Sequence, residues 1–127
     1  MPTNCLLPDP DVSWNRSAAL NMLGGDESLL NEMIEIFLAD SPKLLGQIEQ
    51  ALMHRDQRKL EIAAHSLKGE LLYLGVQEAK EAAEKLEAAG RTGEMEGAPE
   101  LLDELRSRLA VLWTALAPGG SFMNVGQ

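Results

Sequence analysis

The segment AHSLKG, at residues 64–69, contains the residues of this chain that are best suited to chemistry. An imidazole titrates near neutral pH, and its unprotonated nitrogen is a nucleophile. His65 supplies that group, Lys68 supplies a cation one helical turn away, and Gly69 leaves space beside them. A nucleophile next to a cation and an open surface favours reaction with an anionic group such as a phosphoryl group.

The residues around His65 have the periodicity of an amphipathic helix. At about 100° per residue, one apolar stripe lies roughly opposite His65. Its members are Leu60, Ala63, Leu67, Leu71 and Leu74. His65 is therefore predicted to point away from the core, with Lys68 and Gly69 on its face. Glycine inside a helix costs about 1 kcal/mol relative to alanine, which indicates that the absence of a side chain at Gly69 has a purpose. We interpret it as open space that lets another protein approach the imidazole.

This stretch resembles the signature of the histidine-containing phosphotransfer (HPt) domain, which is His-x-Leu-Lys-Gly followed by a hydrophobic residue and Gly. Here it reads HSLKG at residues 65–69 and LG at residues 74–75, and an LE pair follows at residues 86–87. The resemblance covers roughly residues 12–116. Glu70 departs from the pattern, because many relatives carry a small residue there. Helical projection directs Glu70 well away from the His65 direction, so we expect it to leave the site undisturbed.

The resemblance implies that His65 accepts a phosphoryl group and passes it to or from the aspartate of a response-regulator receiver domain in a two-component phosphorelay. In this family a Gln or Glu accepts a hydrogen bond from the δ nitrogen of the phosphorylated histidine, and Glu87 holds that position here. Lys68 would stabilise the phosphoryl charge, with Arg91 as a weaker candidate for the same task. Gly69 would provide steric clearance.

The partners implied by the resemblance are a receiver domain and a sensor or hybrid histidine kinase. No cofactor or metal ion is expected in this chain, because the Mg²⁺ needed for transfer belongs to the receiver's acidic pocket. The sequence contains no glycine-rich phosphate loop and no Asp or Asn set of the kinase type. We therefore expect a phosphocarrier without kinase activity of its own, not an enzyme.

Composition favours a small helical domain and excludes several classes. The chain has 127 residues, of which 45% are hydrophobic and 4% aromatic. A net charge of −9 argues against nucleic-acid binding, although Arg55, Arg58 and Lys59 make the surface before His65 less negative. One cysteine, Cys5, excludes an internal disulfide and favours the cytoplasm. No apolar stretch approaches the ~20 residues of a membrane span, and no signal peptide is visible.

Helical periodicity and capping residues predict where the elements lie. The expected helices cover residues 14–22, 27–53, 57–74, 76–89 and 99–116. Asp26 and Asp56 are suited to N-caps, and Gly75 and Gly90 to helix ends. Ser41 and Pro42 interrupt the second helix, which is either bent or divided in two, and residues 91–97 read as a loop.

These helices predict an all-α fold, an antiparallel up-down four-helix bundle with a short extra N-terminal helix. The bundle would occupy residues 12–117, between an extended lead-in at 1–11 and a flexible tail at 118–127, and would be monomeric. Across the hairpin around Gly75, His65 and Glu87 lie at similar distances from the turn. The two side chains are therefore expected to be neighbours.

Three other functions stay open on the sequence alone. One is a helical adaptor that docks a receiver or kinase without transferring phosphate, and a second is the phosphoacceptor module of a chemotaxis-type histidine kinase. A four-helix metal protein is disfavoured, because the helices lack paired Glu-x-x-His motifs. His54 lies at a predicted helix end, where a solvated or helix-terminal charge is expected in place of a second site.

Overall fold

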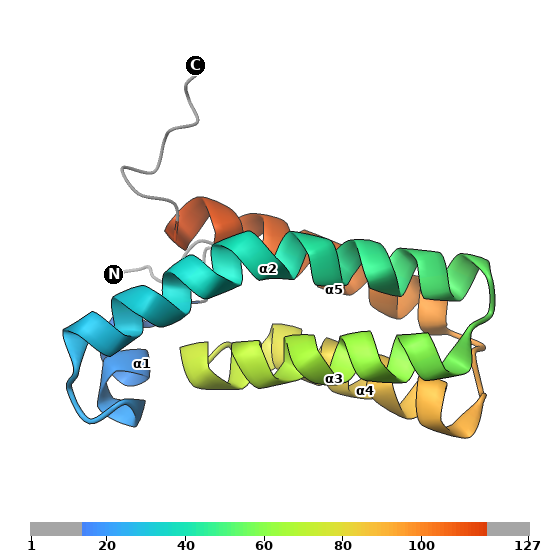
Figure 1. Cartoon of the computed structure of the whole chain (residues 1–127), viewed down its shortest axis with the longest axis horizontal. Helices are drawn as coiled ribbons and strands as arrows, with labels where there is room; N and C mark the ends of the chain where they lie inside the picture. The colour runs from blue at the N-terminus through green and yellow to red at the C-terminus, as the bar shows by residue number, and fades with distance from the viewer. Residues whose placement is uncertain (1–13, 117–127) are drawn as a thin grey trace, which may run out of the picture.

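A computed structural model describes residues 14–116 of the chain, which form five helices (Figure 1). The helices are α1 (Arg16–Met22), α2 (Glu27–Met53), α3 (Gln57–Leu74), α4 (Gln77–Thr92) and α5 (Ala98–Leu116). The lead-in expected at residues 1–11 and the tail expected at 118–127 lie outside the described residues. The domain limits predicted from the sequence therefore stay predictions.

The four long helices form an antiparallel bundle. Each packs against the next helix in the chain, and α5 closes the ring against α2. The short helix α1 packs on α2 and α3 at the end of the bundle where α3 finishes (Figure 1). Residues 14–116 contain no strand. The predicted fold class is confirmed.

The core is built from apolar stripes on the long helices, including the one that the sequence predicts around His65. On α3 the five stripe residues, Leu60, Ala63, Leu67, Leu71 and Leu74, are at most 1% exposed. On α5 the leucine seam is also buried, and it consists of Leu102, Leu105, Leu109, Leu112 and Leu116. Each buried leucine contributes about 1.5–3 kcal/mol through the hydrophobic effect. This packing fixes the rotation of α3 and directs His65 outward.

Helix α2 is continuous through Pro42. Figure 1 shows it running obliquely above α1 and then bending to lie along α3. Proline lacks the amide proton of the helical ladder, and a serine that bonds back to its own helix also favours bending. Ser41 Oγ is buried, donates to the carbonyl of Phe37 at 2.5 Å and accepts from Trp113 Nε1 at 2.8 Å. Of the two expectations for this segment, the bent single helix is the correct one.

The predicted end of the fourth helix at Gly90 is wrong. Helix α4 continues to Thr92 and ends at Gly93, whose φ is +83°, so the loop begins two residues later than expected. A Cβ on Gly90 would lie 2.6 Å from the backbone nitrogen of Glu61 and 2.8 Å from the carbonyl oxygen of Gln57. Gly90 is therefore needed for the close approach of the α3 and α4 backbones.

The ends of α3 agree with the sequence prediction. Asp56 accepts a hydrogen bond from the Lys59 amide at 3.1 Å, and Gly75 ends the helix with a φ of +73°. Beyond that end, the Trp14 indole donates to the carbonyl of Leu74 at 2.9 Å. Helix α1 begins at Arg16, two residues later than predicted, because Asn15 is its N-cap. These contacts hold α3 at both ends and leave His65 near its middle.

Within residues 14–116, no helix combines the length and the apolar character that crossing a bilayer requires.

Candidate functional site

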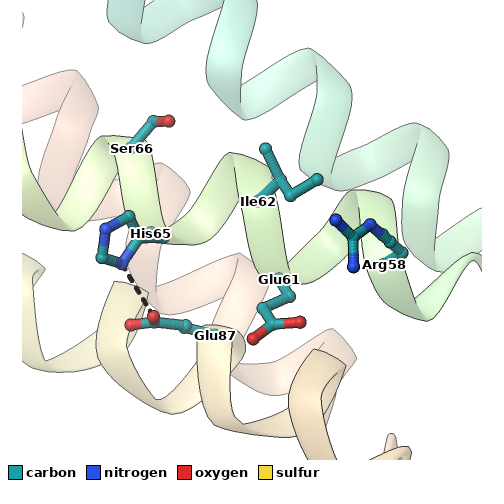
Figure 2. A pocket seen from close by; sticks show the side chains of 6 residues that line it. All are labelled: Arg58, Glu61, Ile62, His65, Ser66 and Glu87. Carbon is teal, nitrogen blue, oxygen red and sulfur yellow. Dashed lines mark hydrogen bonds and ion pairs between the residues drawn. The ribbon is translucent and has the colours of Figure 1, made fainter.

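The centre of the site is a contact between His65 on α3 and Glu87 on α4. Their Nδ1 and Oε2 atoms are 2.8 Å apart (Figure 2). The His65 side chain is 66% exposed, whereas that of Glu87 is 10% exposed. The other ring nitrogen, Nε2, lies on the far side of the imidazole from Glu87. The two residues are neighbours, as the hairpin around Gly75 predicts.

Two cations share the carboxylate of Glu87 with His65. Lys68 Nζ lies 2.7 Å from Oε1, and one Arg91 guanidinium nitrogen lies 3.9 Å from Oε2. The Lys68 side chain is 26% exposed, so its contact is less accessible to water than an ordinary surface ion pair. The family resemblance predicts that Lys68 stabilises the charge of a phosphoryl group on His65. In the structure it contacts Glu87.

Glu87 is an ionised carboxylate at neutral pH. Burial by itself raises the pKa of Glu87, but the hydrogen bonds and charges of Lys68 and His65 outweigh it and hold the pKa below its ordinary value. An ionised acceptor at Oε2 favours the ring tautomer that carries its proton on Nδ1. The lone pair of the imidazole is then on Nε2, the exposed nitrogen.

A shallow pocket surrounds the imidazole. It is lined by Arg58, Glu61, Ile62, His65, Ser66 and Glu87. Figure 2 shows that α3 supplies all of these side chains except Glu87. Of the three cations that precede His65 in sequence, Arg58 lines this pocket, while Arg55 and Lys59 do not. Arg58, Lys68 and Arg91 therefore provide the positive charge that makes the surroundings of the site less negative.

The surface beside His65 is open and partly apolar. A Cβ built on Gly69 has no neighbour within 4 Å, so the missing side chain leaves free space instead of serving internal packing. Ile62 is 53% exposed and Leu72 is 48% exposed, and they flank the imidazole along α3. This arrangement gives another protein access to Nε2.

Sequence reasoning missed two features near the site. The first is the close α3–α4 contact at Gly90. Three small residues share one buried face of α4, namely Ala79, Ala83 and Gly90. Their spacing in the sequence could have indicated a close helix–helix contact. The second feature is the environment of Glu70, which was set aside because it does not point toward His65.

Glu70 lies beside Asp40 of α2, on the side of α3 that faces that helix. Burial, a hydrogen bond with Asp40 and repulsion from the charge of Asp40 together raise the pKa of Glu70 to about 8, and burial contributes most. Oε1 of Glu70 is buried and has no hydrogen-bond partner among the described residues. Glu70 therefore adds little negative charge to the site at neutral pH, which agrees with the expectation that it leaves the site undisturbed.

The metal-protein alternative has no ligand set in the described part of the chain. Between residues 14 and 116, no three His, Cys, Asp or Glu side chains form a group that could hold a metal ion.

Comparison with known proteins agrees with the fold and the motif. The model of the Hpt domain family matches residues 32–115, which is more than half of the chain. Among solved structures, histidine-containing phosphotransfer protein B (HptB) from Pseudomonas aeruginosa PAO1 is similar, with a TM-score of 0.75 and 22% identity, over 86% of this chain and 95% of that one. At this identity the likeness is evidence for the fold. A search of curated proteins finds no match. From the family match, the chain belongs to the Hpt domain family, the phosphotransfer domains of phosphorelays.

Proposed function

We propose that His65 is the phosphoacceptor of this Hpt domain and that it exchanges a phosphoryl group with the aspartate of a response-regulator receiver domain. The observation that supports this most directly is the 2.8 Å contact between Nδ1 of His65 and the Glu87 carboxylate. That contact orients a ring that is otherwise 66% exposed. The nucleophilic nitrogen is thereby fixed toward solvent, where a partner protein can reach it.

The transfer follows from this geometry. The Nε2 lone pair forms a bond to phosphorus while the bond between phosphorus and the aspartyl oxygen breaks, and its electron pair leaves with the receiver's carboxylate. Nδ1 retains its proton and donates a hydrogen bond to Glu87. The phosphoryl oxygens then lie beside Lys68, whose ammonium stabilises their charge, and Arg91 adds a second positive charge nearby.

Docking uses the open surface around Gly69. A receiver must bring its aspartate to Nε2, and the free space at Gly69 admits its backbone or side chains. Exposed Ile62 and Leu72 supply apolar contacts on either side of the imidazole. A sensor or hybrid histidine kinase would reach the same face, because its phosphoryl group must arrive at the same nitrogen.

The domain carries phosphoryl groups without producing them. On this proposal the Mg²⁺ for transfer is bound by the receiver, and this chain holds neither a nucleotide nor a metal ion. The cytoplasmic location and the monomeric state expected from the sequence stay predictions.

The deciding experiment is transfer from a phosphorylated receiver domain, with Mg²⁺, to the wild-type protein and to His65→Gln. We expect a label on the wild type that is lost in acid and stable in base, and no label on His65→Gln. His54→Gln is the matched control, because the second histidine of the chain is exposed at the end of α2, and it should be labelled like the wild type. Measurable binding without label across several receivers would favour the adaptor function instead.

A second test addresses docking. Gly69→Trp fills the space beside His65 and should reduce the transfer rate at least tenfold while the bundle stays folded, as judged by circular dichroism. Gly46→Trp is the control, because a Cβ at Gly46 also has no neighbour within 4 Å but lies on α2. Undiminished transfer to Gly69→Trp would contradict the proposed docking surface.

A further inference from the structure

Glu87 holds two partners at once in the unphosphorylated protein. Oε2 contacts Nδ1 of His65 at 2.8 Å, and Oε1 contacts the Lys68 ammonium at 2.7 Å. Because the Glu87 side chain is 10% exposed and that of Lys68 is 26% exposed, water and salt screen this ion pair less than they screen a fully exposed one. Lys68 therefore balances the charge of Glu87 while the imidazole ring is neutral.

Phosphorylation changes the charges on both sides of Glu87. When Nε2 bonds to phosphorus and Nδ1 keeps its proton, the ring becomes positively charged. The phosphoryl group on the opposite side of the ring brings about two negative charges at neutral pH. The ring then has a charge that Glu87 attracts, and the phosphoryl oxygens have a charge that Lys68 attracts.

Building on the function proposed above, we infer that phosphorylation makes Glu87 exchange its charge partner. The carboxylate takes the positive charge of the phosphorylated His65 ring and releases Lys68 to the phosphoryl group. The ion pair between Glu87 and Lys68 is thereby replaced by two, one between Glu87 and the ring and one between Lys68 and the phosphoryl group. A glutamine in place of Glu87 would still accept the Nδ1 hydrogen bond, but it has no charge with which to hold either partner.

The exchange determines how easily the phosphoryl group leaves. In onward transfer the bond between Nε2 and phosphorus breaks, its electron pair returns to Nε2, and phosphorus bonds to the oxygen of the acceptor, a receiver carboxylate or water. If Nδ1 holds its proton, the leaving group is a neutral imidazole. If that proton has been lost, the leaving group is an imidazolate anion, which leaves far less readily. Because Glu87 favours the form in which Nδ1 is protonated, phosphorylated His65 stays competent for transfer up to a higher pH.

Other charged groups also face this part of the site. Arg58 and Glu61 line the same pocket from α3, and Arg91 approaches Oε2 from α4 at 3.9 Å. These three residues are present in every variant used below, so their contributions are common to the comparison. The charge removed at position 87 is the variable.

The test is the pH dependence of phosphohistidine hydrolysis in the wild type and in Glu87→Gln. Both are labelled at His65 with the small-molecule donor phosphoramidate, and the loss of label is followed from pH 6 to 10. An opposite charge within hydrogen-bond distance shifts a titration by about 1–3 pH units. We expect the pH at which the phosphorylated form becomes long-lived to fall by at least about one unit in Glu87→Gln. Between the two midpoints its lifetime should increase by up to about tenfold for each unit of that fall.

Glu84→Gln is the matched control. Glu84 is on the same helix, its side chain is 54% exposed, and it lies 3.9 Å from Lys80. This substitution removes the same charge outside the pocket, so its hydrolysis profile should coincide with that of the wild type. A shift as large as that of Glu87→Gln would overturn the inference, because it would assign the effect to the net charge of the helix.

The release of Lys68 from Glu87 can be measured separately. A double-mutant cycle of Glu87→Gln and Lys68→Gln, read by urea unfolding in the cold, gives the coupling between the two side chains. We expect coupling in the unphosphorylated protein and its loss after phosphorylation. Undiminished coupling, or a hydrolysis profile of Glu87→Gln equal to that of the wild type, would overturn the inference while leaving the phosphocarrier function intact. Failure of both phosphoramidate and receivers to label wild-type His65 would overturn the proposed function and this inference with it.

Discussion

Two partly buried carboxyl groups lie on opposite sides of helix α3, Glu87 of α4 in the seam with α4 and Glu70 of α3 itself in the seam with α2. On the α4 side, Glu87 is surrounded by His65, Lys68 and Arg91. On the α2 side, Glu70 faces another acid, Asp40. The first carboxyl has a pKa below its ordinary value, and the second has a pKa raised to about 8. Both carboxyl groups lie at the surface of the helix that bears His65, yet Glu87 is charged at neutral pH and Glu70 is largely protonated.

The difference shows that the partners of a carboxyl decide its charge, because desolvation acts in the same direction on both. Desolvation raises the pKa at Glu87 as well as at Glu70. At Glu87 the cations reverse that effect, whereas at Glu70 Asp40 adds to it. The chain has a net charge of −9 when every acid is counted as ionised, so the protonation of Glu70 also makes the surface near the site less negative than this count suggests.

The largest expected effect comes from breaking the α3–α4 seam itself with Gly90→Ala. A Cβ there would lie 2.6 Å from the Glu61 backbone nitrogen, so the two backbones must separate. We expect a loss of about 1–3 kcal/mol in the free energy of unfolding, measured with urea. The contact between His65 and Glu87 depends on this seam, so the orientation of the ring should loosen as well.

Gly46→Ala is the comparison for Gly90→Ala. Gly46 lies inside α2, and a Cβ there meets no atom within 4 Å. Alanine should therefore stabilise α2 by up to about 1 kcal/mol through helix propensity. A Gly90→Ala protein as stable as Gly46→Ala would mean that the α3–α4 seam is not as close as described.

A smaller effect is expected from Glu70→Gln, which removes the carboxyl group with the raised pKa from the α2 side. An acid whose folded pKa is above its unfolded value binds more protons in the folded state, so it lowers stability as the pH rises between the two values. For Glu70 this interval extends from about 4.5 to about 8. We expect Glu70→Gln to match the wild type near pH 4.5 and to exceed it by the order of 1 kcal/mol at pH 9, a figure that allows for partial solvent screening.

Urea unfolding at several pH values measures this difference directly. Glu84→Gln is a suitable control, because it removes an exposed acid that lies beside Lys80. It should show no comparable gain as the pH rises. If Glu70→Gln gains nothing at pH 9, Glu70 is ionised and solvated like an ordinary surface glutamate, and the contrast with Glu87 disappears.

The sequence predicted the placement of His65 and Glu87 better than it predicted the seams between helices. The apolar stripe on α3 was enough to direct His65 outward, and the distances from Gly75 were enough to place Glu87 opposite it. Gly90 was misread because glycine both ends helices and permits close backbone contact, and these two roles are separated only by knowing which helix packs there. The pairing of Asp40 with Glu70 depends on the register between α2 and α3, which the connecting turn and the packing determine together.

The partner of Lys68 could not be predicted for a similar reason. A motif gives the type and position of a residue, while a long side chain chooses its contact among the groups within reach. The sequence suggested an anion that arrives from outside, and the structure shows an anion already present at 2.7 Å. The local charge state of the site is therefore a property of the folded hairpin.

The smallest expected effect is the acid sensitivity that Glu87 gives to the fold. Because its folded pKa is below the unfolded value, its contribution to stability is present above the unfolded pKa and is lost as the pH falls through the folded pKa. We expect the wild type to lose somewhat more stability than Glu87→Gln between pH 6 and pH 3, by less than about 1 kcal/mol, because His65 and Arg91 are more than half exposed. Urea unfolding at the two pH values gives the difference. A loss as large in Glu87→Gln as in the wild type would show that Glu87 orients the ring without its ion pairs stabilising the bundle. The two sides of α3 would then differ in charge but not in their effect on stability.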